Sequence, residues 1–180
     1  MERRTLMLTL SGAALPLLVQ AAPRFALAQP TGAATPSTPM DMAQYRLLTL
    51  TVGSLAKQTS ELALERALHP QVKQFAGFEN AEQTTLAQVL TDMQNPPPPP
   101  LDANGQAILR QLQATSGPGF DQAYIQAQIQ AHQQLFGIQN AVLQGQTGMT
   151  TDTAHVAMLA RYVIQTHLVM LQDIARILHT

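Results

Sequence analysis

Five consecutive prolines occupy residues 96–100. Proline lacks a backbone N–H and its ring clashes with the preceding helical turn, so neither a helix nor a central strand can continue through this segment. A run of this kind adopts an extended polyproline conformation, and we expect it to act as a spacer rather than as an SH3-type ligand. The segments on either side must therefore fold as separate elements.

The part of the chain before the prolines shows helical periodicity twice. Residues 41–68 carry a stripe of Leu48, Val52, Leu55, Thr59 and Leu62. Residues 70–93 carry a second stripe of Val72, Phe75, Phe78, Leu86, Val89, Leu90 and Met93. Because Pro70 suits the first turn of a helix, we predict two long helices joined by a short turn.

Three more helices are predicted after the prolines. Residues 102–115 fit a short helix with Ile108 and Leu112 facing inward, which would cap the bundle. Residues 120–145 and 150–179 fit two long helices, and the short link between them makes them antiparallel neighbours. No segment beyond the first 28 residues alternates apolar and polar side chains with a period of two. The sequence therefore predicts an all-α four-helix bundle with one short extra helix.

Composition narrows the possible functions. The 180 residues suffice for one domain, and the formal net charge is −1 without any basic run, so we expect no nucleic-acid partner. With no cysteine, the chain has neither disulfides nor thiolate metal ligands nor a Cys nucleophile. It also lacks a nucleophile-elbow motif and a glycine-rich phosphate loop. These absences favour a non-enzymatic role.

The first 28 residues have the layout of a cleavable signal peptide. Arg3 and Arg4 precede an apolar stretch that extends to Val19, and Ala26 and Ala28 supply small residues before the expected cut. The apolar stretch is shorter than the roughly 20 residues that span a bilayer, which disfavours a retained anchor. The paired arginines fit either a twin-arginine signal or an ordinary positively charged n-region.

Export determines the expected location and domain limits. Residues 29–40 are rich in Pro, Thr, Ser and Ala and are predicted to form a disordered spacer before a helical domain at residues 41–180. We expect a periplasmic or secreted protein that has no integral membrane span once the signal peptide is removed. Its expected partner is a protein or a component of the cell envelope.

Three segments resemble an exported family, domain of unknown function 4142, which is often labelled predicted outer-membrane protein and grouped with ferritin-like bundles. They read LALERALHPQVKQFA, SGPGFDQAYIQAQIQAHQQLF and RYVIQTHLVML. The resemblance spans about residues 40–178. It implies a ferritin-like bundle and an exported protein, with an association with the outer membrane as a further expectation. The family usually has a Glu where this chain has Ala56, and an Asp-His pair where it has Glu82 and Gln83.

Four polar side chains are predicted to face the core. Glu79 and Glu82 fall within the apolar arc of the second helix, and His132 and His167 lie within the apolar stripes of the last two long helices. Ferritin-like bundles hold Fe or Mn pairs with such groups, and imidazole with carboxylate also suits Zn. The four residues are therefore candidate metal ligands.

The alternative is a hydrogen-bonded network that fixes the register of the helices without metal. Its candidate members are Asp121, Tyr124, Gln128, His132 and His167, with Glu82 beside them. No helix carries the Glu-x-x-His spacing of dinuclear sites, and Ala56 and Gln83 stand where the family would supply two more ligands. The sequence favours the network over a complete dinuclear site, and bound metal would distinguish the two.

Overall fold

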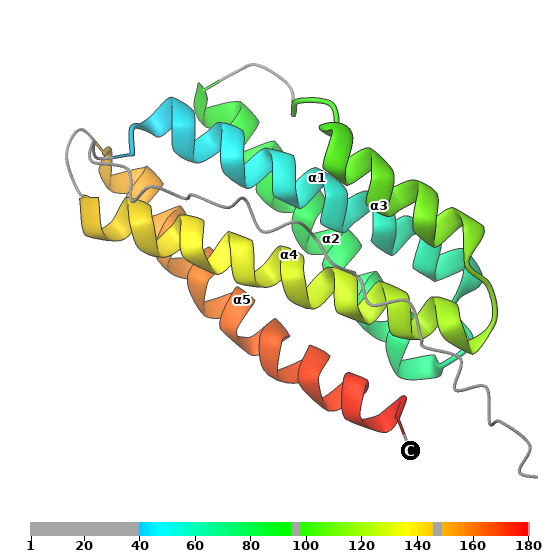
Figure 1. Cartoon of the computed structure of the whole chain (residues 1–180). Coiled ribbons are helices and arrows are strands. Elements are labelled where there is room, and N and C mark those ends of the chain that lie inside the picture. Colours follow the sequence, from blue (N-terminus) through cyan, green and yellow to red (C-terminus); the bar gives the residue numbers. More distant parts are fainter. Residues whose placement is uncertain (1–39, 95–97, 146–148, 180) are drawn as a thin grey trace, which may run out of the picture.

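The computed structural model describes residues 40–94, 98–145 and 149–179, which form five α-helices and no strand (Figure 1). The helices are α1 (Met42–Arg66), α2 (Pro70–Gln94), α3 (Ala103–Ala114), α4 (Pro118–Gly145) and α5 (Thr151–Ile177). The prediction of an all-α bundle with one short extra helix is confirmed. The predicted signal peptide and nearly all of the predicted spacer lie outside the described residues.

Local sequence signals determine where the helices begin. Asp41, Asp102 and Thr150 are N-caps whose side chains accept a hydrogen bond from the backbone N–H three residues later. Pro70 occupies the first position of α2, where its missing N–H costs nothing. Gly117 has a φ of 63° in the turn before α4, a conformation that glycine adopts without strain.

The four long helices form the bundle, and α3 lies outside it (Figure 1). α1 packs against α2 and α4, and α4 packs against α5. α4 and α5 are antiparallel neighbours, as predicted. The short α3 contacts α1 and α4, and its inward residues Ile108 and Leu112 are buried, which confirms the prediction for this helix. They join the apolar cluster that contains Phe75, Phe120 and Tyr124.

The buried face of α1 differs from the predicted leucine stripe. Leu48 is 39% exposed, and Leu55 and Leu62 are only partly buried. Most of the buried face consists of small residues, which include Thr49, Gly53, Ala56, Ser60 and Ala63. Small side chains allow the backbone of α1 to approach its neighbours closely, so this face of the helix turns inward and the leucines lie on its flanks.

The prediction for α2 was wrong at two positions. Phe78 is 52% exposed and Val89 is 38% exposed, although both belong to the predicted apolar stripe. Val72, Phe75 and Leu90 are buried as predicted. Glu79 and Gln83 are buried on the same helix. The buried face of α2 therefore includes polar residues and differs from the face that hydrophobicity alone indicates.

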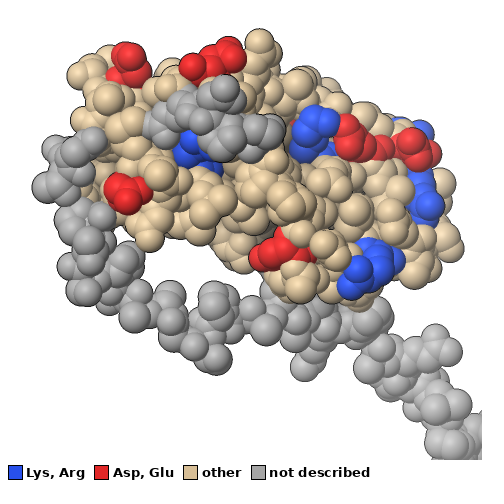
Figure 2. Space-filling model, turned by 90° about the horizontal axis from the view of Figure 1, so that it is seen from above, with Lys and Arg blue, Asp and Glu red and all other residues tan. Residues whose placement is uncertain are grey.

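Charged residues on the surface are sparse. On the face shown in Figure 2, Lys and Arg are interspersed with Asp and Glu, and no block of one sign gathers there. The face shown therefore lacks the basic patch that contacts to nucleic-acid phosphates require. None of the helices in the described part of the chain combines the length and hydrophobicity needed to cross a bilayer.

We predict that Ile164→Asp unfolds the domain, whereas Val169→Asp on the same helix is nearly silent. Ile164 is 2% exposed and packs beside Leu135, while Val169 is 58% exposed. An unpaired buried charge costs several kcal/mol against a total stability of roughly 5–15 kcal/mol, but a surface substitution changes stability by about 0.5 kcal/mol or less. Thermal unfolding followed by far-UV circular dichroism compares the two, and equal melting temperatures would contradict the assignment of the core face.

Candidate metal centre

Three polar side chains from three different helices meet inside the bundle. Glu79 of α2, His132 of α4 and His167 of α5 are 0%, 1% and 7% exposed. Glu79 Oε2 lies 3.1 Å from both His132 Nε2 and His167 Nδ1, and these two nitrogens are 3.2 Å apart. The three atoms thus form a nearly equilateral triangle of potential metal ligands.

The size of this triangle suits a small divalent ion. Zinc is bound tetrahedrally with distances of about 2.0–2.2 Å to nitrogen and oxygen, which places neighbouring ligand atoms roughly 3.3 Å apart. The observed separations of 3.1–3.2 Å fall just below that value. An ion could therefore sit slightly above the plane of the three atoms after a small expansion.

Each ligand atom is oriented by a second hydrogen bond or a packing contact. His132 Nδ1 lies 2.8 Å from the carbonyl oxygen of Gln128, which can only accept, so Nδ1 carries a proton. Nε2 of the neutral ring is then a bare lone pair directed at the triangle. Gln83 Nε2 donates to the other carboxylate oxygen of Glu79 at 3.0 Å. Such outer hydrogen bonds are typical of ligating histidines and carboxylates in metal sites.

Phe75 forms an apolar wall beside both imidazoles. Its ring centroid lies 5.9 Å from that of His132 and 5.2 Å from that of His167, with an edge-on arrangement at His167. Phe75 is fully buried, so it keeps water away from this side of the triangle. Because water is excluded there, the electrostatic interactions within the cluster are stronger than in a solvated site.

Glu82 lies at the edge of the triangle. Its Oε2 is 3.3 Å from His167 Nδ1, but the geometry is not that of a hydrogen bond, and among the described residues this buried oxygen has no hydrogen-bond partner. The side chain is 22% exposed, so it connects the buried triangle with the surface. Of the four predicted ligands, the structure brings Glu79, His132 and His167 together and places Glu82 beside them.

The pKa values reflect the mutual interactions of these groups. Burial by itself would raise the pKa of Glu79, but hydrogen bonds from His132 and His167 and their charges lower it to about 2. Burial and the negative charge of Glu79 raise the pKa of Glu82 to about 7. Burial would lower the pKa of His132, but its hydrogen bond to Glu79 and the carboxylate charges raise it. In the metal-free protein Glu79 and His132 thus each favour the charged form of the other.

Gln128 and Tyr124 form a separate polar layer next to the triangle. Gln128 Nε2 donates to the carbonyl of Ala56 at 3.0 Å and to Thr59 Oγ1 at 2.9 Å. The hydroxyl groups of Tyr124 and Ser60 are 2.9 Å apart. These bonds join α4 to α1, and Gln128 alone links this layer to the imidazoles, through its backbone bond with His132.

Asp121 lies apart from the imidazoles. Its carboxylate accepts hydrogen bonds from the backbone N–H of His69 at 2.7 Å and from that of Leu68 at 3.1 Å. Asp121 precedes His132 by 11 residues, or about 16 Å along α4. Its buried charge therefore holds the turn between α1 and α2 instead of joining the polar layer.

Several participants carry no recognisable sequence signal. In the sequence, Gln83 is notable only because it differs from the family pattern, and Phe75 is indistinguishable from an ordinary core residue. A second buried polar group, in which Tyr45 Oη donates to Gln139 Oε1 at 2.8 Å, was not predicted. The nearby Arg46 Nε donates to the carbonyl of Leu90 at 3.0 Å. These pairs depend on which helices face each other, and single-helix periodicity does not specify this.

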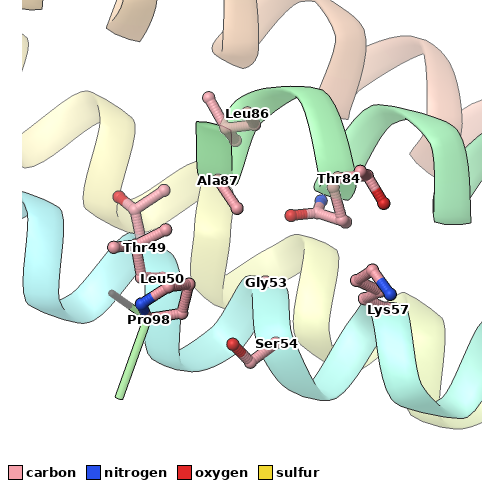
Figure 3. A pocket seen from close by; sticks show the side chains of 10 residues that line it. Thr49, Leu50, Gly53, Ser54, Lys57, Thr84, Leu86, Ala87 and Pro98 are labelled. Carbon is pink, nitrogen blue, oxygen red and sulfur yellow. The ribbon is translucent and has the colours of Figure 1, made fainter. Parts of the chain in front are cut away.

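A small cavity of about 170 Å³ lies between α1 and α2 (Figure 3). Its lining includes Thr49, Ser54 and Lys57 of α1 and Thr84 of α2. Gln83 lines this cavity and is also hydrogen bonded to Glu79. Its amide therefore connects the α1–α2 side of the bundle with the triangle.

The family model described as Domain of unknown function (DUF4142) matches residues 26–174. The chain belongs to the DUF4142 family. The two departures from the family pattern, Ala56 and Gln83, are both buried and both hydrogen bonded to residues around the triangle, Ala56 to Gln128 and Gln83 to Glu79. Neither residue offers a carboxylate or an imidazole, the groups that the resemblance implies at these positions.

Among solved structures, the crystal structure of a DUF305 fragment from Deinococcus radiodurans is similar to this DUF4142 chain. The TM-score is 0.67 at 15% sequence identity, over 77% of this chain and 96% of the other. This likeness supports a ferritin-like helical bundle and concerns the fold alone. No curated protein matches the chain in sequence.

We predict that the melting temperature of the metal-free protein falls as the pH rises from about 5 to 8. Glu79, with its lowered pKa, stabilises the fold above pH 4.5, and this contribution is lost only as the pH falls toward 2. Glu82, with its raised pKa, makes stability decline between pH 4.5 and about 7, because the unfolded chain releases the Glu82 proton at a lower pH than the folded protein does. His132, with its raised pKa, stabilises the fold below 6.5 and loses this contribution at higher pH.

Thermal unfolding in the presence of EDTA measures this dependence. Glu82→Gln should flatten the decline below pH 7, whereas the exposed Glu65→Gln should leave it unchanged. A melting temperature that rises across the whole interval would show that these groups do not interact as their geometry indicates.

Proposed function

We propose that this DUF4142 domain binds one divalent first-row transition metal ion through Glu79, His132 and His167. The observation that carries the proposal is the triangle of one carboxylate oxygen and two imidazole nitrogens, with separations of 3.1–3.2 Å, buried in the bundle. The outer hydrogen bonds from Gln83 and to Gln128 support it, because they hold two of the three ligands in the orientation that a metal needs.

The ligand set narrows the choice of metal. Two imidazoles and one carboxylate bind Zn²⁺ in many sites and form the facial triad of Fe²⁺ proteins, and Mn²⁺ accepts similar ligands. The described residues offer this one cluster of three ligand atoms, and Ala56 and Gln83 provide no further carboxylate or imidazole. The proposed site is therefore mononuclear, with Glu82 as an outer carboxylate and at least one position left for water or a small molecule.

The proposed location is outside the cytoplasm, in the periplasm. The signal-like layout of residues 1–28 supports it, and so does the ligand chemistry, because imidazole and carboxylate are not consumed by the oxidation that would destroy a thiolate site. We propose a binding role in the cell envelope rather than catalysis, with an envelope component or another exported protein as partner.

The metal proposal predicts a specific pattern of stabilisation. Zn²⁺, Mn²⁺ or Fe²⁺ under anaerobic conditions should raise the melting temperature, since an ion present at about 100 times its Kd adds roughly 2.7 kcal/mol. Calorimetric titration should give one ion per chain. His132→Ala and His167→Ala should weaken binding by roughly 100-fold or more, whereas His155→Ala, on the exposed side of α5, should have no effect.

The alternative, a purely structural network, gives a different result. In that case the parent protein would bind none of the three ions and its melting temperature would not respond to them. Replacing either buried histidine by an apolar residue would then only lower stability, by about 1–3 kcal/mol.

We also predict that Gly53→Ala weakens metal binding by roughly tenfold without unfolding the protein. A Cβ at this position would lie 2.4 Å from Gln83 Oε1, so the amide must move and its hydrogen bond to Glu79 is disturbed. Gly137→Ala on α4 is the matched control, because its Cβ meets nothing within 4 Å. Equal affinities of the two variants would show that Gln83 does not orient Glu79.

A further inference from the structure

One pair of neighbouring helices in the bundle is incompletely closed. α2 packs mainly on α1 and α5 mainly on α4, whereas few close approaches of the backbone join α2 to α5 among the described residues. A groove of about 470 Å³ lies between these two helices. Its volume falls within the range of about 300–1,000 Å³ that is typical of small-molecule sites.

The walls of the groove are apolar and reach the surface. Seven of the nine described residues that line it are Ala, Val or Leu, with Leu86 and Val89 on α2 and Val156 and Leu159 on α5 among them. Leu159 is 69% exposed and Val89 is 38% exposed. The exposed apolar side chains at this opening indicate a ligand surface, since soluble domains rarely leave such a concentration uncovered.

The inner end of the groove is anionic. Glu82 is the one charged residue among the described residues that line it, and its buried Oε2 has no hydrogen-bond partner there. Glu82 and Val89 both line the groove on α2 and are seven residues, or about 10 Å, apart along the helix axis. Glu82 therefore lies near one end of the groove and Val89 near the other. Across the groove, Val163 lies one turn before His167 on α5, so the metal triangle begins where the groove ends.

We propose that this groove binds an amphiphilic primary amine, with its ammonium group on Glu82 and its hydrocarbon chain along the apolar walls of α2 and α5. The charge of the inner end decides the class of ligand: Glu82 would repel a ligand carboxylate, whereas an ammonium group donates hydrogen bonds to the carboxylate of Glu82. The apolar length of about 10 Å requires a chain rather than a compact amine. The amine site is complete without a metal, because Glu82 is not a member of the triangle, whereas a Zn²⁺ ion bound there would repel the ammonium group.

The probe is octylamine, titrated calorimetrically into the protein in EDTA and again after loading with Zn²⁺. We expect one saturable site with an affinity for octylamine that is roughly tenfold or more above that for octanol, and no binding of octanoate. Glu82→Gln should reduce the affinity for octylamine to that for octanol. Glu65→Gln on α1 should change neither of these two affinities. Ala81→Phe, at an exposed position that lines the groove, should weaken octylamine and octanol alike.

The outcomes separate this proposal from the metal site. Binding of octylamine in EDTA, together with a melting temperature that Zn²⁺ leaves unchanged, would support the groove and contradict the metal proposal. Equal affinities for octylamine, octanol and octanoate, or an octylamine affinity unchanged in Glu82→Gln, would overturn the groove proposal. So would a protein that is dimeric by analytical ultracentrifugation and becomes monomeric on Leu159→Glu, because a second copy would then cover the groove.

Discussion

The negative charge of Glu79 is the constraint on which the centre of the bundle depends. A carboxylate with no exposed surface must be compensated by hydrogen bonds and opposite charge, or its burial would cost several kcal/mol. The compensation comes from α2 itself through Gln83, from α4 through His132 and from α5 through His167. These three helices must therefore keep a fixed register. A shift of one turn in any of them would leave the Glu79 carboxylate buried without its full set of partners.

α1 contributes packing to this arrangement and no ligand. Its small inward residues let α2 and α4 approach, and its backbone carbonyl at Ala56 accepts a bond from Gln128. A ligand from α1 would have made the site symmetric across the bundle. The ligands instead come from α2, α4 and α5, and the bundle remains open at the groove between α2 and α5, beside Glu82.

Helix periodicity predicted the parts of the fold that are local. The positions of the helices and the inward direction of His132 follow from residues close in sequence. The inward face of α1 could not be predicted in this way, because small residues are buried by close approach of helices and not by their own hydrophobicity. Asp121 was misassigned for a similar reason: its partners are the backbone N–H groups of a turn about 50 residues earlier, and spacing within α4 does not reveal them.

A hydrogen-bonded network explains why the three polar groups are buried, but it accounts less well for how closely they approach. Both imidazole nitrogens face the same oxygen of Glu79 and are 3.2 Å from each other. If both nitrogens carry a proton, the His132 ring is a cation, because its Nδ1 also donates to Gln128, and its N–H faces that of His167; if one nitrogen carries none, its lone pair faces a lone pair of the carboxylate oxygen. A divalent cation satisfies all three lone pairs together. In the proposed site the same atoms would hold a proton at low pH and a metal ion at higher pH, because proton loss from His132 frees the lone pair that the ion requires.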